Sequence, residues 1–216
     1  DHRARARDAG GHLGGRQRRR GRLDAHLGGR PARDGVGRGA EAHPRDEHEL
    51  GGALDDLYHG VVAAALSVAK LPEVTDPGVS RERLASMLSL DPGDLLDGAY
   101  SPQTVSCGLP FLVVPLRDRK AVARSRLRLD QWEESLQGTP SEMVMVFAAD
   151  PERPGSDMRA RTYCPAVSVM EDPATGSACA CLAGYLAART PRDGTLRWVV
   201  EQGFEMGRPS ILEIEA

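Results

Sequence analysis

The residues best suited to chemistry lie in one short stretch, residues 171–177 (EDPATGS). Pro173 disfavours helical backbone at Asp172, and the Thr-Gly-Ser triplet that follows can form a turn and start a helix. The first N–H groups of a helix have no partner within it, and they give that end about half a positive charge. A substrate carboxylate or an enolate-like oxygen would suit such an end, with Asp172 beside it for proton transfer. The alternative is that Asp172 and Ser177 only cap a buried helix.

Metal and phosphate chemistry have less support. The Cys179-x-Cys181 spacing falls inside a predicted helix without a second pair, and five of the six histidines precede residue 50. We therefore expect no metal site. Gly203 and Gly207 are spaced as in a glycine-rich loop. The lysine that follows the glycines of a phosphate-binding loop is missing, so this segment does not match a phosphate-binding motif.

The segments that must position residues 171–177 mix helices and strands without a regular βαβ rhythm, which favours an α+β fold. Ser80 and Asp118 can each cap a helix, and continuous apolar runs predict buried strands. We expect helices at 80–90, 118–128, 130–137 and 176–188, helix-compatible sequence at 61–69, and strands at 109–116, 143–149, 159–163, 196–200 and 210–214.

The predicted helix at 176–188 (GSACACLAGYLAA) has small side chains on nearly every face. Its residues are good helix formers, and an all-round apolar helix is normally buried. We therefore expect it to lie deep in the fold, with strands packed closely around it.

Length and composition narrow the class of protein. The 216 residues allow one or two domains, and 28 basic against 31 acidic residues give a net charge of −3. Nucleic acid is therefore not the expected partner. We find no apolar stretch near the ~18 residues of a spanning helix and no export signal. Four cysteines do not make a disulfide scaffold, so we expect a cytoplasmic protein without membrane association.

Residues 1–50 differ from the rest of the chain. They hold 12 Arg and 10 Gly but no Lys, Ile, Phe, Trp or Tyr, and they carry +4 where the remaining residues carry −7. Such a composition buries too little apolar surface to offset chain entropy. We expect a disordered or frame-shifted Arg/Gly-rich leader at 1–60, followed by a folded domain at 61–216.

Three interpretations of this leader compete. It could be a basic arm that grips nucleic-acid phosphates, although it lacks the aromatic residues that stack on bases. It could be an inert linker. Arg, Gly, Ala, Pro, His and Asp, which all have GC-rich codons, make up 41 of residues 1–50, and the chain opens at Asp1, so we favour an out-of-frame or fragmentary segment.

Several short motifs in the second part of the chain occur in the same order as in a known protein family. Residues 171–178 (EDPATGSA), Gln202-Gly203 and 206–210 (MGRPS), together with 106–111 (SCGLPF) and 159–165, resemble the phenazine-biosynthesis PhzF-like family. That family has the diaminopimelate-epimerase-like fold. The resemblance covers roughly residues 69–216, the second half of a family member.

The resemblance implies two similar α+β domains in the complete protein, each with strands wrapped around a central helix. It further implies an isomerase that works at the cleft between them, as a homodimer, without metal or organic cofactor. The namesake isomerises trans-2,3-dihydro-3-hydroxyanthranilate in phenazine biosynthesis. Carried over by motif, the catalytic residues are Asp172 and Ser177, and a small-carboxylate substrate contacts Thr175, Gly176, Ser177 and Ala178.

The first half of the family pattern is missing. The resemblance implies that a glutamate of the first domain, in an Asn-Leu-Ser-Glu-like context, is the principal acid and base. Neither that context nor the family's Gly-His loop is found, and Glu41, Glu47 and Glu49 have the surroundings of solvated charges. We therefore expect impaired activity in this chain.

Supporting roles and alternatives complete the hypothesis. We expect Arg208 to form a structural ion pair with Glu171, because a guanidinium matches one carboxylate well. Related epimerases use two thiols, so Cys179 and Cys181 allow a thiol-dependent epimerase or racemase. A third possibility is a non-catalytic remnant that binds small carboxylates or dimerises.

Overall fold

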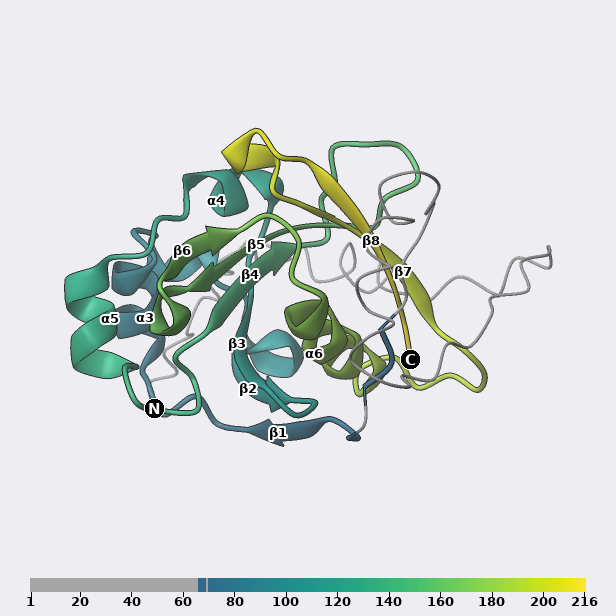
Figure 1. Cartoon of the computed structure of the whole chain (residues 1–216), viewed down its shortest axis with the longest axis horizontal. Coiled ribbons are helices and arrows are strands. Elements are labelled where there is room, and N and C mark those ends of the chain that lie inside the picture. Colours follow the sequence, from purple (N-terminus) through teal and green to yellow (C-terminus); the bar gives the residue numbers. More distant parts are fainter. Residues whose placement is uncertain (1–65, 69) are drawn as a thin grey trace, which may run out of the picture.

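The computed structural model describes residues 66–68 and 70–216. These residues form a mixed sheet and four α-helices, in agreement with the predicted α+β class (Figure 1). The strands are β1 (Glu73–Thr75), β2 (Gln103–Ser106), β3 (Pro110–Pro115), β4 (Val144–Ala148), β5 (Met158–Cys164), β6 (Val169–Asp172), β7 (Arg197–Gln202) and β8 (Ser210–Glu215). The helices are α3 (Arg81–Met87), α4 (Arg119–Arg124), α5 (Leu129–Ser135) and α6 (Gly176–Ala187).

The sheet has eight strands in the order β1-β2-β3-β4-β5-β7-β8, and β6 pairs with β5 beside this path. Two pairs, β3–β4 and β5–β7, are parallel, and the remaining pairs are antiparallel. β5 is thus the strand on which both β6 and β7 are aligned.

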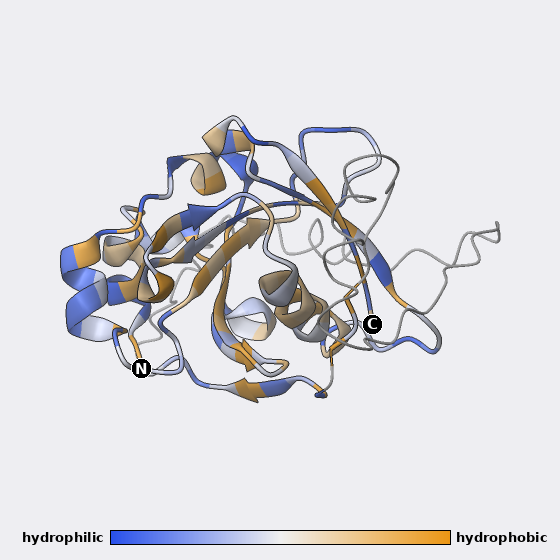
Figure 2. Cartoon of the chain, in the orientation of Figure 1, coloured by the Kyte–Doolittle hydropathy of each residue, from blue (hydrophilic) through white to orange (hydrophobic). Residues whose placement is uncertain are grey.

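Helix α6 lies inside the curve of this sheet, where it contacts β2, β3 and β8 (Figure 1). Eight of its twelve residues are buried, and apolar residues of the surrounding strands complete the same core (Figure 2). Phe147 of β4 meets the ring of Tyr185 edge-to-face, with centroids 5.9 Å apart. The prediction of a central small-residue helix is thus confirmed. Its small side chains let strands pack closely against the helix from several sides.

The opposite face of the sheet is covered by α3, α4 and α5, which form a second core. Ser80 caps α3 by accepting a hydrogen bond from the Arg83 amide, and Asp118 caps α4 by accepting one from the Ala121 amide. Both predicted caps are confirmed. We expected the helix after Asp118 to reach Arg128, and this is wrong: α4 ends at Arg124.

The early end of α4 has a tertiary cause. Ser125 adopts extended backbone, and its hydroxyl bonds back to the Val122 carbonyl and to Tyr163 of β5. The chain then runs alongside the end of α3, where the Arg126 amide donates to Leu88. Contacts far apart in sequence therefore override local helix propensity here.

Three short strands, β1, β2 and β6, were not predicted, because three or four residues without an apolar run give little signal. In the predicted helical segment 61–69, Leu66–Val68 have no regular secondary structure, and the remainder lies outside the described residues. The expected leader and its boundary at residue 60 also lie outside them. No helix in the described part of the chain is long and apolar enough to span a membrane.

Candidate active site

The stretch selected from the sequence connects the end of β6 to the start of α6. Asp172 is the last residue of β6, and Gly176 is the first of α6. Ala174 and Gly176 are exposed, Asp172 and Ser177 are half-buried, and Thr175 is 7% exposed. Among the described residues the turn is therefore partly exposed, with the Leu66 side chain beside it, 3.5 Å from where a Cβ of Gly176 would lie.

A hydrogen-bond network orients Asp172 within this turn. The Thr175 hydroxyl donates to Asp172 Oδ2 at 2.6 Å. Gln202, at the end of β7, donates from Nε2 to Thr175 Oγ1 at 2.9 Å and to the Asp172 carbonyl at 2.7 Å. Its Oε1 accepts from the Thr175 amide at 3.3 Å. One glutamine side chain thus fixes both ends of the turn.

The direction of these bonds follows from the groups involved. A threonine hydroxyl carries one proton. Because Thr175 Oγ1 accepts from Gln202, that proton is free to point at Asp172 Oδ2. Oδ2 of Asp172 therefore already accepts one hydrogen bond within the turn.

The N-terminus of α6 supplies the second part of the site. Thr175 occupies the capping position but makes no side-chain cap, because its hydroxyl is turned to Asp172. The amides of Gly176, Ser177 and Ala178 belong to the first turn, which has no intrahelical acceptor for them. Together with the Ser177 hydroxyl, they can bind a carboxylate, and the helix dipole favours that charge.

Two buried arginines of β5 anchor the strands that carry Asp172 and Gln202. Arg161 forms a two-pronged ion pair with Glu171, with both N–O distances 2.7 Å. Arg159 pairs with Glu201 at 3.1 Å, directly across from it in the β5–β7 ladder. Consecutive strand residues point to opposite faces. Each glutamate thus points to the helix-covered outer face, while the residue after it, Asp172 or Gln202, points to the α6 side.

The expected pair between Glu171 and Arg208 is therefore wrong. Arg161, which the sequence placed in a strand but not in the site, takes the Glu171 carboxylate instead. The Arg208 side chain is exposed. Arg208 contributes through its backbone, since its amide donates to the Gly203 carbonyl at 2.9 Å.

Arg161 also links the site to the outer core. Its Nη1 donates to the carbonyls of Val122, Ala123 and Ser125, at the end of α4. Burial opposes its charge, but the hydrogen bond to Glu171 and the charges of Tyr163, Glu171 and Glu205 together outweigh it and raise the pKa of Arg161. A permanently charged guanidinium thus satisfies the free carbonyls of a helix end and one acidic side chain together.

A tight turn at residues 203–207 packs against the Asp172 turn from the other side. Gly203 has φ +77°, and a Cβ there would lie 2.3 Å from the Arg208 carbonyl oxygen and 2.8 Å from that of Pro173. Glycine is required at this position both for the backbone conformation and for the close approach to Pro173. The sequence marked Gln202-Gly203 only as part of a motif, with no indication of these contacts.

Next to this turn, Arg159 holds an acidic cluster. Besides Glu201, it pairs with Glu205 at 3.0 Å and stacks on the Phe204 ring at 3.9 Å. Burial of Glu201 opposes its charge, but bonds from the Glu152 and Arg153 amides and from Arg159 outweigh it and lower the pKa of Glu201. An ionised Glu201 thus secures the strand that delivers Gln202.

The thiols are poorly suited to proton transfer at neutral pH. Burial raises the pKa of Cys179 and of Cys181 to about 12, so both stay protonated. Within residues 66–68 and 70–216, no group of three or more His, Cys, Asp or Glu side chains is arranged to hold a metal ion.

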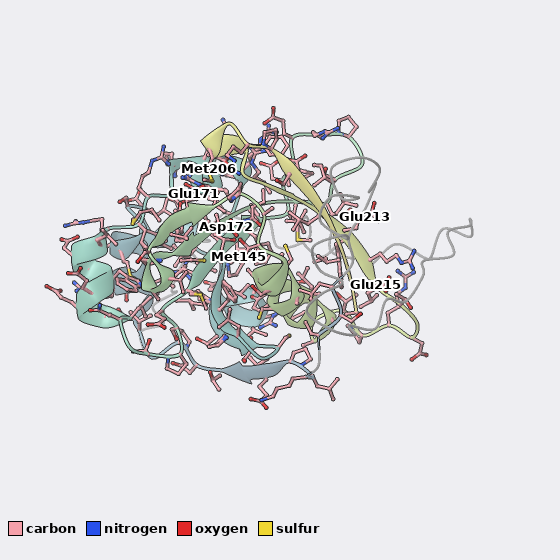
Figure 3. All side chains as sticks on the ribbon, viewed as in Figure 1. Met145, Glu171, Asp172, Met206, Glu213 and Glu215 are labelled. Carbon is pink, nitrogen blue, oxygen red and sulfur yellow. The ribbon has the colours of Figure 1, made fainter. Side chains whose placement is uncertain are left out.

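Three other carboxylates on the strands are poorly placed to act together with Asp172. Glu171 is committed to Arg161. Glu213 and Glu215 lie on β8, well away from Asp172 (Figure 3). Glu215 also pairs with Arg197 at 3.1 Å.

Comparisons with known proteins identify the family of the domain. A family model described as phenazine biosynthesis-like protein matches residues 57–216. An uncharacterized isomerase of Mesorhizobium japonicum is 31% identical over 163 residues, which cover 73% of this chain and 54% of that protein. An uncharacterized isomerase of Clostridium acetobutylicum is 26% identical over 141 residues, 64% of this chain and 46% of that protein. The chain spans about half the length of these relatives.

Solved structures show the same fold. A PhzF-family phenazine biosynthesis protein of Bacillus anthracis superposes with a TM-score of 0.60 at 23% identity, covering 68% of this chain and 50% of that one. A predicted epimerase of Pseudomonas aeruginosa superposes with a TM-score of 0.51 at 30% identity, covering 67% of this chain and 48% of that one.

We predict that Gly203→Ala destabilises the protein by about 2–4 kcal/mol, because a strained backbone and a steric clash each cost roughly 1–3 kcal/mol. Gly207→Ala is the matched control: it has φ +68° in the same turn but nothing within 4 Å of its Cβ. Urea unfolding measures both, and amide shifts of residues 172–177 should move only in Gly203→Ala. Equal losses in the two variants would contradict the contact with Pro173.

We also predict a pH-dependent contribution from Glu201. Its pKa is lower in the folded state, so it stabilises the fold above the ordinary value of 4.5, and this contribution is lost as pH falls towards the folded pKa. Glu201→Gln should therefore cost about 1–3 kcal/mol at pH 7 and progressively less below pH 4.5. The control is Glu215→Gln, an exposed pair expected to change stability by under about 1 kcal/mol. A pH-independent loss in Glu201→Gln would disprove this role.

Proposed function

Because the chain belongs to the phenazine biosynthesis-like family, we propose that it forms the second half of a cofactor-independent isomerase. The reaction is a proton transfer on a small carboxylate, cyclic or amino-acid-like, of which the isomerisation of trans-2,3-dihydro-3-hydroxyanthranilate is the family's namesake case. The single observation that carries the proposal is Asp172, oriented by Thr175 beside the partly exposed first turn of α6.

Each part of the turn has a role in the proposed reaction. The substrate carboxylate accepts hydrogen bonds from the Gly176, Ser177 and Ala178 amides and from the Ser177 hydroxyl. This holds the reacting carbon near the carboxylate of Asp172, which takes up or returns the proton. Thr175 and Gln202 keep the Asp172 carboxylate in place, so that it need not reorient when charge develops on the substrate.

A proton shift of this kind needs a second acid–base group at the receiving carbon. The resemblance assigns it to a glutamate of the first domain, and this chain spans about half the length of its relatives. A positioned acid or base contributes typically 10²–10⁴-fold to the rate. We propose that this chain by itself retains the carboxylate site and lacks efficient turnover.

A non-catalytic carboxylate-binding remnant is the alternative that shares this site, and the same partly exposed turn supports it. A thiol-dependent epimerase is less well supported, because burial keeps Cys179 and Cys181 protonated. The homodimer and the cytoplasmic location remain predictions. The leader, for which a basic arm was one of three interpretations, lies outside the described residues.

The binding part of the proposal predicts that 3-hydroxyanthranilate perturbs the amide NMR signals of residues 174–178. 2-Aminophenol, which lacks the carboxylate, should not. Ser177→Ala should weaken binding about 3–10-fold, since one hydrogen bond contributes about 0.5–1.5 kcal/mol. Identical perturbations by the two compounds would rule out carboxylate recognition at this turn.

The catalytic part predicts negligible isomerisation of trans-2,3-dihydro-3-hydroxyanthranilate by purified 1–216, followed by absorbance and by deuterium incorporation from D₂O. The missing acid–base group is the reason. Robust turnover that Asp172→Asn abolishes would show instead that the chain is a complete enzyme.

A further inference from the structure

Two cysteine side chains lie where the β2–β3 turn packs against α6. Cys107 Sγ lies 3.6 Å from the carbonyl oxygen of Ala180, and Cys181 Sγ lies 3.5 Å from that of Leu109. Cys107 thus contacts the residue before Cys181, and Cys181 contacts the residue two positions after Cys107. These reciprocal contacts bring both side chains to the same junction between the turn and the helix.

The other two cysteines cannot replace either member of this pair. Cys179 lies two residues before Cys181 on the same helix, and helix residues at this spacing point in different directions. Cys164 is the last residue of β5 and is buried. Cys107 is half-buried and is the most accessible of the four thiols.

We propose that Cys107 and Cys181 are an oxidisable dithiol, which a small-molecule disulfide converts into an intramolecular disulfide between the β2–β3 turn and α6. The inference does not rest on the proposed function. It rests on the reciprocal contacts of the two sulfurs with the backbone beside the other cysteine, the access to Cys107, and the conformation of the turn that carries it. In that turn Gly108 has φ +124°, and its amide donates to Ser106 Oγ at 3.3 Å.

The reaction proceeds by two exchanges. The Cys107 thiolate attacks one sulfur of the oxidant and displaces one thiolate, forming a mixed disulfide. Deprotonated Cys181 then attacks Cys107 Sγ and displaces the second thiolate. The protein loses two protons and two electrons, and the oxidant is reduced to two thiols.

Burial sets the conditions for this reaction. It raises the pKa of Cys107, and it raises the pKa of Cys181 to about 12, so both exchanges slow at neutral pH and accelerate with rising pH. Once closed, the disulfide joins positions 107 and 181, which are 74 residues apart in the chain, and restricts the unfolded state. It also fastens α6, whose first turn carries the candidate site, to the sheet.

The experiment treats the full chain with oxidised glutathione at pH 8.5, blocks the remaining thiols, and maps disulfides by mass spectrometry without reduction. We expect a peptide pair joining Cys107 to Cys181 and a melting temperature raised by roughly 5–15 °C, reversed by dithiothreitol. Cys179→Ser and Cys164→Ser should retain the linkage. Cys107→Ser, at the half-buried member of the pair, should remove both the linkage and the rise.

Three outcomes would overturn the proposal. One is a linkage through Cys164 or Cys179, and another is Cys107 left as a stable mixed disulfide with glutathione. The third is retention of all four free thiols. The mapping uses the unsubstituted chain, so the test does not depend on any variant that folds poorly.

Discussion

The burial of α6 is the constraint on which the rest of the structure depends. A helix surrounded by strands can present few large side chains, and eight of its twelve residues are buried. Of the other four, Gly176 is exposed, and Ser177, Ala180 and Ala187 are half-buried. The helix end with the positive dipole therefore carries the one fully exposed residue of α6. The twelve residues of α6 thus form the centre of the core and also supply the helix N-terminus of the candidate site.

Two buried arginine–glutamate ion pairs on the outer face of the sheet hold the strands of the site in place. A buried ion pair contributes little net stability once desolvation is counted, but it fixes geometry when all of its hydrogen bonds are formed. Arg159 and Arg161 lie two residues apart on one face of β5, and each anchors the neighbour of a site residue. β5 consequently fixes the positions of β6 and β7, although none of its own side chains belongs to the proposed carboxylate site.

The sequence revealed the site in part, for physical reasons. The Pro-x-Thr-Gly-Ser turn and the small-residue helix are local features, so their position could be predicted from residues 171–188 alone. Gln202 acts across 27 positions, and Arg161 looked like one residue of an alternating strand. Nothing in a polar–apolar pattern distinguishes a buried arginine with a bidentate partner from a solvated one. The same limit explains the wrong partner predicted for Glu171.

The contacts of Gln202 also bear on how the protein folds. Asp172 and Thr175 take their observed orientation only when β7 lies parallel to β5 in the correct register, since a slip by one residue would turn Gln202 away and bring Glu201 inward. Parallel pairing across a long connection forms slowly, because loop closure must precede it. The orientation of Asp172 is therefore expected to be set late, after the helix and its turn already exist, so that a nascent chain that ends before β7 would lack the Gln202 contacts that hold Asp172 and Thr175.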